Sequence, residues 1–173
     1  MQKLGVSTQL LAGADIYPAL ERGVIDAPEF SMPTMDIDLG FYQIAKFNYY
    51  PGWHQPSSAS ELLMNKAAWE ALPDAYQAMI ELGAGESIHF TYVETEAKNP
   101  VAMNEMLEKY GVQNVRWSDD ELAAFEQAWS EVLAEQSAAD PTFKKVADSY
   151  LAFRKVYKPW GDAQALNATY LTK

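Results

Sequence analysis

The chain has 173 residues and carries 13 lysines and arginines against 24 aspartates and glutamates, which gives a formal net charge of −11. Its content of 49% hydrophobic and 13% aromatic residues excludes a disordered chain and is enough for a folded core. The acidic balance argues against nucleic acids and anionic membrane surfaces as partners, and the lack of cysteine excludes disulfides, thiol nucleophiles and zinc–thiolate sites.

The beginning of the chain carries no recognisable secretory signal, because Met1 to Val6 contains Lys3 but no apolar stretch and no small-residue cleavage site. No apolar run reaches the roughly 18 residues that a membrane-spanning helix needs. The protein is therefore either cytosolic or lacks its original beginning. We favour the second interpretation, since the first residues lead directly into a predicted strand.

Residues 1–27 predict a β-α-β unit. The short apolar runs 6–11 and 24–27 are typical of buried strands. Asp15 is expected to cap a helix over 15–22, which Gly23 ends. Because a helix connects the two strands, they are expected to pair in parallel.

The next predicted elements alternate between helix, strand and loop. A mixed polar and apolar run favours a helix over 35–44. Residues 47–50 form a strand that Pro51-Gly52 ends with a strong turn signal, so Trp53 to Pro56 lie on a loop. The run 61–64 reads as a third buried strand.

Helices dominate the rest of the chain. Apolar residues recur at helical spacing over 73–110, and Gly83, Gly85 and Pro100 predict a kink in this long helix before Gly111 ends it. The other expected elements are a helix over 66–72 capped by Asn65, a strand over 112–117, a helix over 118–137 opened by a Ser118–Glu121 capping box, a helix that Asp140-Pro141 begins and Pro159 to Asp162 interrupt, and a short helix over 163–170.

These elements predict an α/β chain whose C-terminal region is rich in helices. We expect residues 1–72 to form an α/β ligand-binding region, and residues 73–117 to provide a long kinked helix and a short strand that span two domains. Residues 118–173 then form C-terminal helices. Their aromatic stripe from Phe143 to Tyr157 makes them a possible dimerisation element.

The first candidate site is Glu29, which follows the predicted strand 24–27. Ligands of open parallel sheets bind beyond the carboxyl ends of the strands, so this carboxylate is placed to meet one. Pro28 fixes the approach of the chain, and Phe30 supplies an apolar wall that strengthens a charge contact. The alternative is an ordinary solvated loop glutamate.

The second candidate site is the aromatic segment from Tyr49 to Gln55. Aromatic walls with a few polar groups are typical of small-molecule pockets, and here Trp53, His54 and Gln55 would line one. His54 could act as a general base, although no serine or aspartate stands at a triad spacing, and His89 has no second ligand one helical turn away. A turn packed on the core with a surface histidine is an equally good interpretation.

Three segments together resemble a known family. They are LGVSTQLLAGADIYPALERGVIDAPEF, LGFYQIAKFNYYPGWHQP and ELLMNKAAWEALP, and their order and spacing are similar to the solute-binding proteins of tripartite ATP-independent periplasmic (TRAP) transporters, in the branch that binds 2-oxo acids and related carboxylates. The most specific parts are YPALERGVIDA and YYPGWHQP. The likeness runs over the first half of the chain, and the helix-rich remainder agrees with that family's C-terminal region.

The resemblance implies a two-domain Venus-flytrap receptor in the periplasm that closes on a small carboxylate and delivers it to a membrane permease. It implies that Glu29 binds a metal ion, that Phe30 contributes its main-chain carbonyl, and that Gln55 contacts the substrate beside Trp53 and His54. Oxygen ligands suit sodium or calcium rather than zinc. Some relatives exchange a C-terminal helix between two protomers, which implies a homodimer.

The chain departs from this family in two respects. Phe30 replaces the usual tryptophan, which keeps the carbonyl and most of the ring surface but loses the indole donor. The arginine that binds the substrate carboxylate and a glutamine that binds the metal lie upstream of every residue present, so the chain resembles the C-terminal part of such a receptor. We therefore expect weak or absent carboxylate binding by this chain alone.

Two other functions remain open from the sequence. One is an enzyme that uses Glu29 and His54 as an acid–base pair on a small metabolite. The other is a helical interaction module that binds a partner chain through the long helix and the C-terminal stripe. The resemblance favours a binding protein without enzymatic activity.

Overall fold

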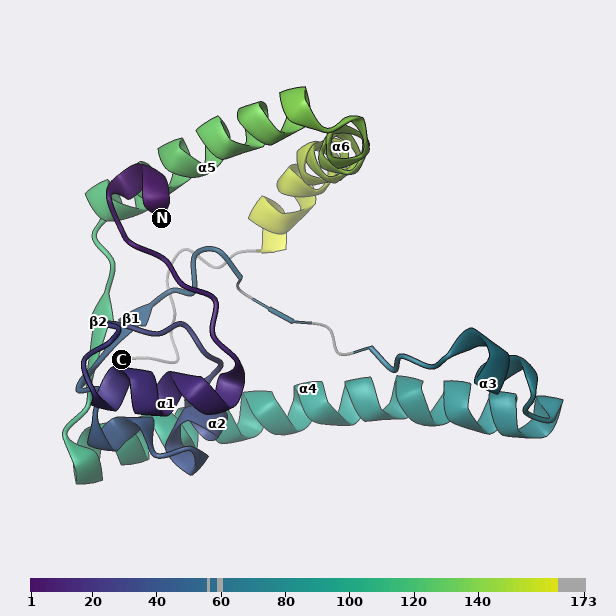
Figure 1. Cartoon of the computed structure of the whole chain (residues 1–173), viewed down its shortest axis with the longest axis horizontal. Helices are drawn as coiled ribbons and strands as arrows, with labels where there is room; N and C mark the ends of the chain where they lie inside the picture. The colour runs from purple at the N-terminus through teal and green to yellow at the C-terminus, as the bar shows by residue number, and fades with distance from the viewer. Residues whose placement is uncertain (56, 59–60, 165–173) are drawn as a thin grey trace. The chain divides into compact units, whose positions relative to one another are not determined.

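The computed structural model describes residues 1–55, 57–58 and 61–164. The chain divides into two compact units, each with its own packing (Figure 1). We call residues 9–118 the sheet unit, and residues 1–8 together with 119–173 the helical unit. None of the described helices is both long and apolar enough to cross a membrane.

The sheet unit packs helices beside a small parallel sheet. Its core consists of small and apolar side chains from α1, from the turn at Phe41 and from the last turns of α4. The described elements, in chain order, are α1 (Gly13–Glu21), α2 (Pro33–Asp38), the 3₁₀ turn η2 (Phe41–Gln43), β1 (Phe47–Tyr50), α3 (Lys66–Glu70), α4 (Asp74–Tyr110) and β2 (Gln113–Arg116).

Helix α1 ends where Gly23 predicts, but the strand expected over 24–27 is wrong. Gly23 has a φ of 69° and donates its N–H to Leu20 O at 3.0 Å, and Val24 N–H reaches Ala19 O at 2.8 Å. These two bonds are the Schellman end of a helix, so the Val24 amide is used by the helix rather than by a sheet. At the other end Ala12 is the N-cap, and Asp15, predicted to cap, lies in the first turn.

Two further strand predictions, 6–11 and 61–64, are also wrong. Both segments are extended or irregular without ladder pairing, and Leu10 and Leu63 are 99% and 88% exposed. A strand needs a neighbour for its backbone N–H and C=O groups, and no such neighbour lies beside either segment in the described part of the chain. Apolar β-branched composition alone therefore does not make a strand here.

The helix predicted over 35–44 is split into α2 and η2. Gly40, at φ 79°, separates them in a left-handed conformation that side chains disfavour. The consequence is a sharp turn that brings Phe41 into the core, where its side chain is buried.

The predicted strands at 47–50 and 112–117 are confirmed, and they pair with each other. β1 and β2 run parallel, with Phe47 opposite Gln113 and Tyr50 opposite Arg116. The parallel pairing expected between 6–11 and 24–27 thus occurs between other segments, across the long connection that includes α4. Lys46, the residue before β1, holds this strand to the end of α4, because its Nζ donates to Tyr110 O at 3.2 Å.

Helix α4 runs without interruption through the positions expected to kink it (Figure 1). Pro100 removes one backbone N–H, yet Pro100 and the residue four before it, Glu96, are exposed, so water can satisfy the freed carbonyl.

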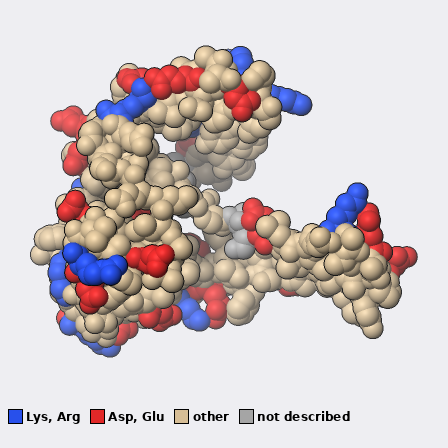
Figure 2. All heavy atoms as spheres, in the orientation of Figure 1, with Lys and Arg blue, Asp and Glu red and all other residues tan. Residues whose placement is uncertain are grey.

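Asn65 caps the short α3 as predicted, because its Oδ1 accepts from Ala68 N–H at 3.1 Å. Residues other than lysine, arginine, aspartate and glutamate cover much of the surface of α4 in Figure 2. The largest exposed apolar residues there are Tyr76, Met79, Leu82, Ile88, Phe90 and Tyr92.

The helical unit is built from α5 (Asp119–Ala139), α6 (Pro141–Gln164) and the N-terminal 3₁₀ turn η1 (Gln2–Leu4). Asp140 caps α6 as predicted, accepting from Thr142 N–H at 2.7 Å. Lys3 fastens η1 to α5 by donating to Glu135 Oε1 at 2.7 Å. Phe125 and Ala128 of α5 and Ala147 of α6 are buried.

The break expected at Pro159 to Asp162 is wrong, because α6 continues to Gln164. The Pro159 ring lies on an exposed turn, and Lys158 pairs with Asp162 at 2.6 Å across it. The short helix expected over 163–170 falls mostly outside the described residues.

Candidate functional site

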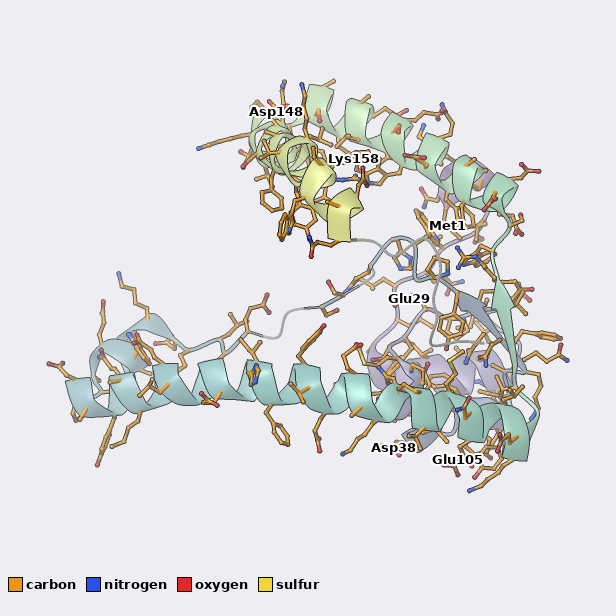
Figure 3. The ribbon with its side chains drawn as sticks, turned by 180° about the vertical axis from the view of Figure 1, so that it is seen from behind. Met1, Glu29, Asp38, Glu105, Asp148 and Lys158 are labelled. Carbon is orange, nitrogen blue, oxygen red and sulfur yellow. The ribbon has the colours of Figure 1, made fainter. Side chains whose placement is uncertain are left out.

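The structure brings together the two segments that the sequence singles out. Glu29 lies on the loop between α1 and α2, and His54 lies on the loop that follows β1. Their closest atoms, Glu29 Oε2 and His54 Nε2, are 3.9 Å apart, with side chains 62% and 42% exposed. In Figure 3 Glu29 lies among these loops, whereas the labelled Asp38 lies on the other side of the helices.

Aromatic packing fixes the Glu29 loop. The ring of Phe30 contacts the buried ring of Phe41 with centroids 5.2 Å apart, and Tyr17 contacts Phe41 at 5.8 Å. A Cβ built at Gly13 would lie 3.7 Å from the Phe30 ring, an ordinary van der Waals distance, so the first residue of α1 lies against this ring. Phe30 therefore anchors the loop through its side chain and leaves Glu29 exposed.

The loop after β1 is held by its own contacts. Tyr49 packs on Trp117 with ring centroids 4.5 Å apart, and the rings of Trp53 and His54 lie 5.2 Å apart. Gln55 donates from Nε2 to Ser58 Oγ at 2.7 Å, within the same loop. Trp53 and His54 thus lie on the side of Glu29, while Gln55 is engaged locally.

Asp36 is a member of this site that sequence reasoning missed. Its Oδ1 atom is buried and has no hydrogen-bond partner among the residues that the structure describes. Burial raises the pKa of this carboxyl to about 6, and the charge of Glu29 adds to the effect. Burial, followed by the charge of Asp36, also raises the pKa of the Tyr50 phenol, at the end of β1. Nothing in the sequence distinguishes Asp36 from its exposed neighbour Asp38.

The site combines negative charge with oxygen donors. Glu29 offers an exposed carboxylate, Phe30 a main-chain carbonyl, and Asp36 a buried oxygen without a partner. Oxygen donors and excess negative charge suit a hard cation such as calcium or sodium. Within the described ranges no three acidic or histidine side chains gather closely enough to hold a metal by themselves. By the chemistry of their oxygens, these residues are candidates for one side of a cation site.

The acid–base alternative finds less support in the geometry. The distance of 3.9 Å between Glu29 and His54 exceeds the hydrogen-bond range, so neither side chain orients the other as a base and its partner do in a catalytic dyad. Both side chains are substantially exposed, so solvent screens their interaction. The pair resembles two polar groups at the rim of a site more than a catalytic dyad.

Two open grooves in the described part of the chain lie away from Glu29. One, of about 620 Å³, belongs to the helical unit and lies between η1 and α5. The other, of about 390 Å³, belongs to the sheet unit and is mainly apolar; it is lined by Leu62, Met64, Lys66, Trp69, Ile80, Glu81 and Ala84. Neither groove includes a residue of the candidate cation site.

Comparison with known proteins gives consistent results. Residues 1–140 match the DctP family model, described as bacterial extracellular solute-binding protein, family 7. The chain is 34% identical over 167 residues to a monocarboxylate 2-oxoacid-binding periplasmic protein of Nostoc, covering 96% of this chain and 46% of that protein.

A solved structure is similar along nearly the whole chain. It is a TRAP transporter solute-binding protein from Bordetella bronchiseptica, matched with a TM-score of 0.85 at 33% identity over 94% of this chain and 48% of that one. That crystal structure is a dimer of mixed occupancy, with copurified calcium and picolinate in one active site and none in the other. The chain thus spans about half the length of the relatives that it matches.

Proposed function

The chain belongs to family 7 of the bacterial extracellular solute-binding proteins, and from that membership we propose that it forms part of a TRAP receptor that captures a small carboxylate together with a cation. The ligand class is a 2-oxo or 2-hydroxy acid. The name of the Nostoc relative supports this class, and the Bordetella relative, whose active site holds calcium and the carboxylate picolinate, supports the pairing of a carboxylate with a cation.

One observation carries the proposal. The loop bearing Glu29 and Phe30 and the loop bearing Trp53 and His54 are distant in sequence, yet they meet at the 3.9 Å contact between Glu29 and His54. In the proposed site Glu29 and the Phe30 carbonyl bind calcium or sodium. Trp53, His54 and Gln55 border the carboxylate, so release of Gln55 from Ser58 accompanies binding.

The proposed ligand site is open on one side. The residues named for the site supply acidic and carbonyl oxygens but no arginine or lysine to pair with a substrate carboxylate, and a buried carboxylate without such a partner is unfavourable. This chain matches about half of each relative. We infer that the part of the receptor that corresponds to the other half completes the site and supplies that positive charge. In its cellular setting the receptor is periplasmic, and its partner is the membrane permease of the transporter.

The aromatic face of α6 supports a homodimer as the working form. Tyr150, Phe153 and Tyr157 are 53%, 63% and 50% exposed, and their spacing of three and four residues places them on one side of α6. Phe153 and Tyr157 stack with centroids 5.6 Å apart and so form one continuous apolar surface. A second copy of α6 is the proposed cover, and the Bordetella relative is itself a dimer.

Calorimetric titration tests the proposed ligand. Pyruvate and picolinate are titrated, with calcium or with sodium, into this chain and into a chimera joined to the remaining half of the Bordetella receptor. The chimera is expected to bind with calcium or sodium present, and the chain alone to bind weakly or not at all. Glu29→Gln should remove the cation dependence, whereas Asp38→Asn, its control on another face, should not. A chimera that binds neither acid refutes the ligand class.

A further inference from the structure

We propose that Asn99 of α4 is a positioning residue for the candidate cation site, because its side-chain amide caps α2 and so fixes the loop that carries Glu29 and Phe30. The inference rests on the proposed function for its ligand, and on the hydrogen bonds between α2 and α4 for its geometry. Asn99 touches neither Glu29 nor Phe30; it acts through the start of α2.

The start of α2 lacks a cap of its own. Met32 is the N-cap residue and its thioether cannot replace the serine or aspartate oxygen usual at this position. Pro33 follows as the first helical residue, so the first N–H that needs an acceptor is that of Thr34. A helix of six residues depends strongly on such end contacts, because it has few internal hydrogen bonds.

Asn99 provides the missing acceptor from another helix. Its Oδ1 accepts the Thr34 N–H at 3.2 Å and the Thr34 hydroxyl at 2.7 Å. Its Nδ2 lies 3.4 Å from Met32 Sδ and donates to that sulfur. All three contacts are partly buried, so water competes less for them than it would at the surface.

These contacts lie close to the candidate ligands in sequence. Phe30 precedes Met32 by two residues and is anchored by its ring on Phe41, so the loop is fixed at the ring and at the start of α2. Glu29 lies just outside the first anchor, and Asp36 lies in α2 itself. Release of the cap therefore loosens the whole segment that presents oxygen donors to the cation.

Three variants separate this role from a merely structural one. Asn99→Leu keeps the branched shape, with a somewhat larger volume, and removes the acceptor, whereas Asn99→Asp keeps an oxygen for both Thr34 bonds. Asn104→Leu, an identical change at an exposed position of the same helix, is the matched control.

Terbium, a luminescent probe for calcium sites, is titrated into each protein. The same titration of Glu29→Gln shows whether the ion binds at Glu29. Nuclear magnetic resonance follows the amide exchange of Thr34 and the amide shifts of Glu29 and Phe30.

The expected results are faster Thr34 exchange, shifted Glu29 and Phe30 amides and about fivefold weaker terbium binding in Asn99→Leu, the factor that loss of one cap corresponds to. Asn104→Leu should match the parent chain, and Asn99→Asp, which loses the bond to Met32 but keeps both bonds to Thr34, should retain the slow Thr34 exchange of the parent. Unchanged Glu29 and Phe30 shifts in Asn99→Leu, or unchanged terbium affinity where the parent binds, overturn the inference. A parent chain that does not bind terbium counts against the cation site instead, and the amide shifts then decide the role of Asn99.

Discussion

Replacement of Asp36 by asparagine is expected to stabilise the protein at neutral pH. One oxygen of the Asp36 carboxyl, Oδ1, is buried and has no hydrogen-bond partner among the residues that the structure describes. Burial raises the pKa of this carboxyl from the ordinary 3.8 to about 6. Below pH 3.8 the group is protonated in the folded and unfolded states and has no effect. Between pH 3.8 and about 6 the unfolded chain ionises this carboxyl more readily than the folded protein does, so the free energy of unfolding falls as the pH rises through this range. Above pH 6 it stays at the lower value.

The size of the effect follows from the shift. A difference of about 2 pKa units corresponds to an upper limit of about 3 kcal/mol in the free energy of unfolding. Water still reaches part of the Asp36 side chain, which reduces the expected gain to about 1–2 kcal/mol for Asp36→Asn at pH 7.5. The gain should shrink toward zero at pH 4, where the carboxyl of the parent chain is largely protonated.

Urea unfolding followed by tryptophan fluorescence at pH 4, 5, 6 and 7.5 measures this difference. Asp38→Asn, an exposed change in the same helix, is the control and should leave the pH dependence unchanged. If Asp36→Asn is no more stable than the parent at pH 7.5, or if its advantage is the same at pH 4, the buried charge is not the cause. Calcium should stabilise the parent more than Asp36→Asn, because the cation relieves the same charge.

Three further outcomes follow from the structure. Gly40→Ala should lower the free energy of unfolding by about 1–2 kcal/mol, because Gly40 has a φ of 79°, a left-handed conformation that strains a residue with a side chain; thermal denaturation measures the loss. Gly83→Ala, in open space on α4, should instead raise the melting temperature, corresponding to about 0.5–1 kcal/mol, and no gain would contradict its helical environment. Phe153→Ser should shift sedimentation toward the monomer, and Val101→Ser, an exposed change on α4, should not; equal behaviour of both variants would argue against α6 as the interface.

The candidate site was only partly predictable. The aromatic segment with Trp53 and His54 could be found from its composition after a strand that does form, whereas Glu29 is singled out by a predicted strand over 24–27 that does not form. The structure nevertheless places Glu29 beside His54. Asp36 could not be found, since its burial depends on the packing of α2 against segments that are distant in sequence, above all α4. Asn99 could not be found either, because its partners Thr34 and Met32 are far from it in sequence.

Local signals in the sequence determined the helices and their ends. Asn65 and Asp140 cap α3 and α6, and Gly23 and Gly111 end α1 and α4. Each of these depends on contacts within a few residues, where side-chain chemistry and backbone conformation decide the outcome without distant partners. Prolines inside long helices misled the prediction, since solvent compensates for the hydrogen bond that each removes, and the glycines of α4 keep their N–H groups and so remove none.

Tertiary structure alone decided which extended segments became strands and which side chains became buried. Residues 6–11, 24–27 and 61–64 have the composition of strands, but only 47–50 and 113–116 find each other in register. A strand is stabilised by backbone bonds to a distant segment, and a carboxyl acquires a raised pKa only when other segments exclude water from it. Pairing and desolvation are properties of the assembled chain, and so they appear only once it has folded.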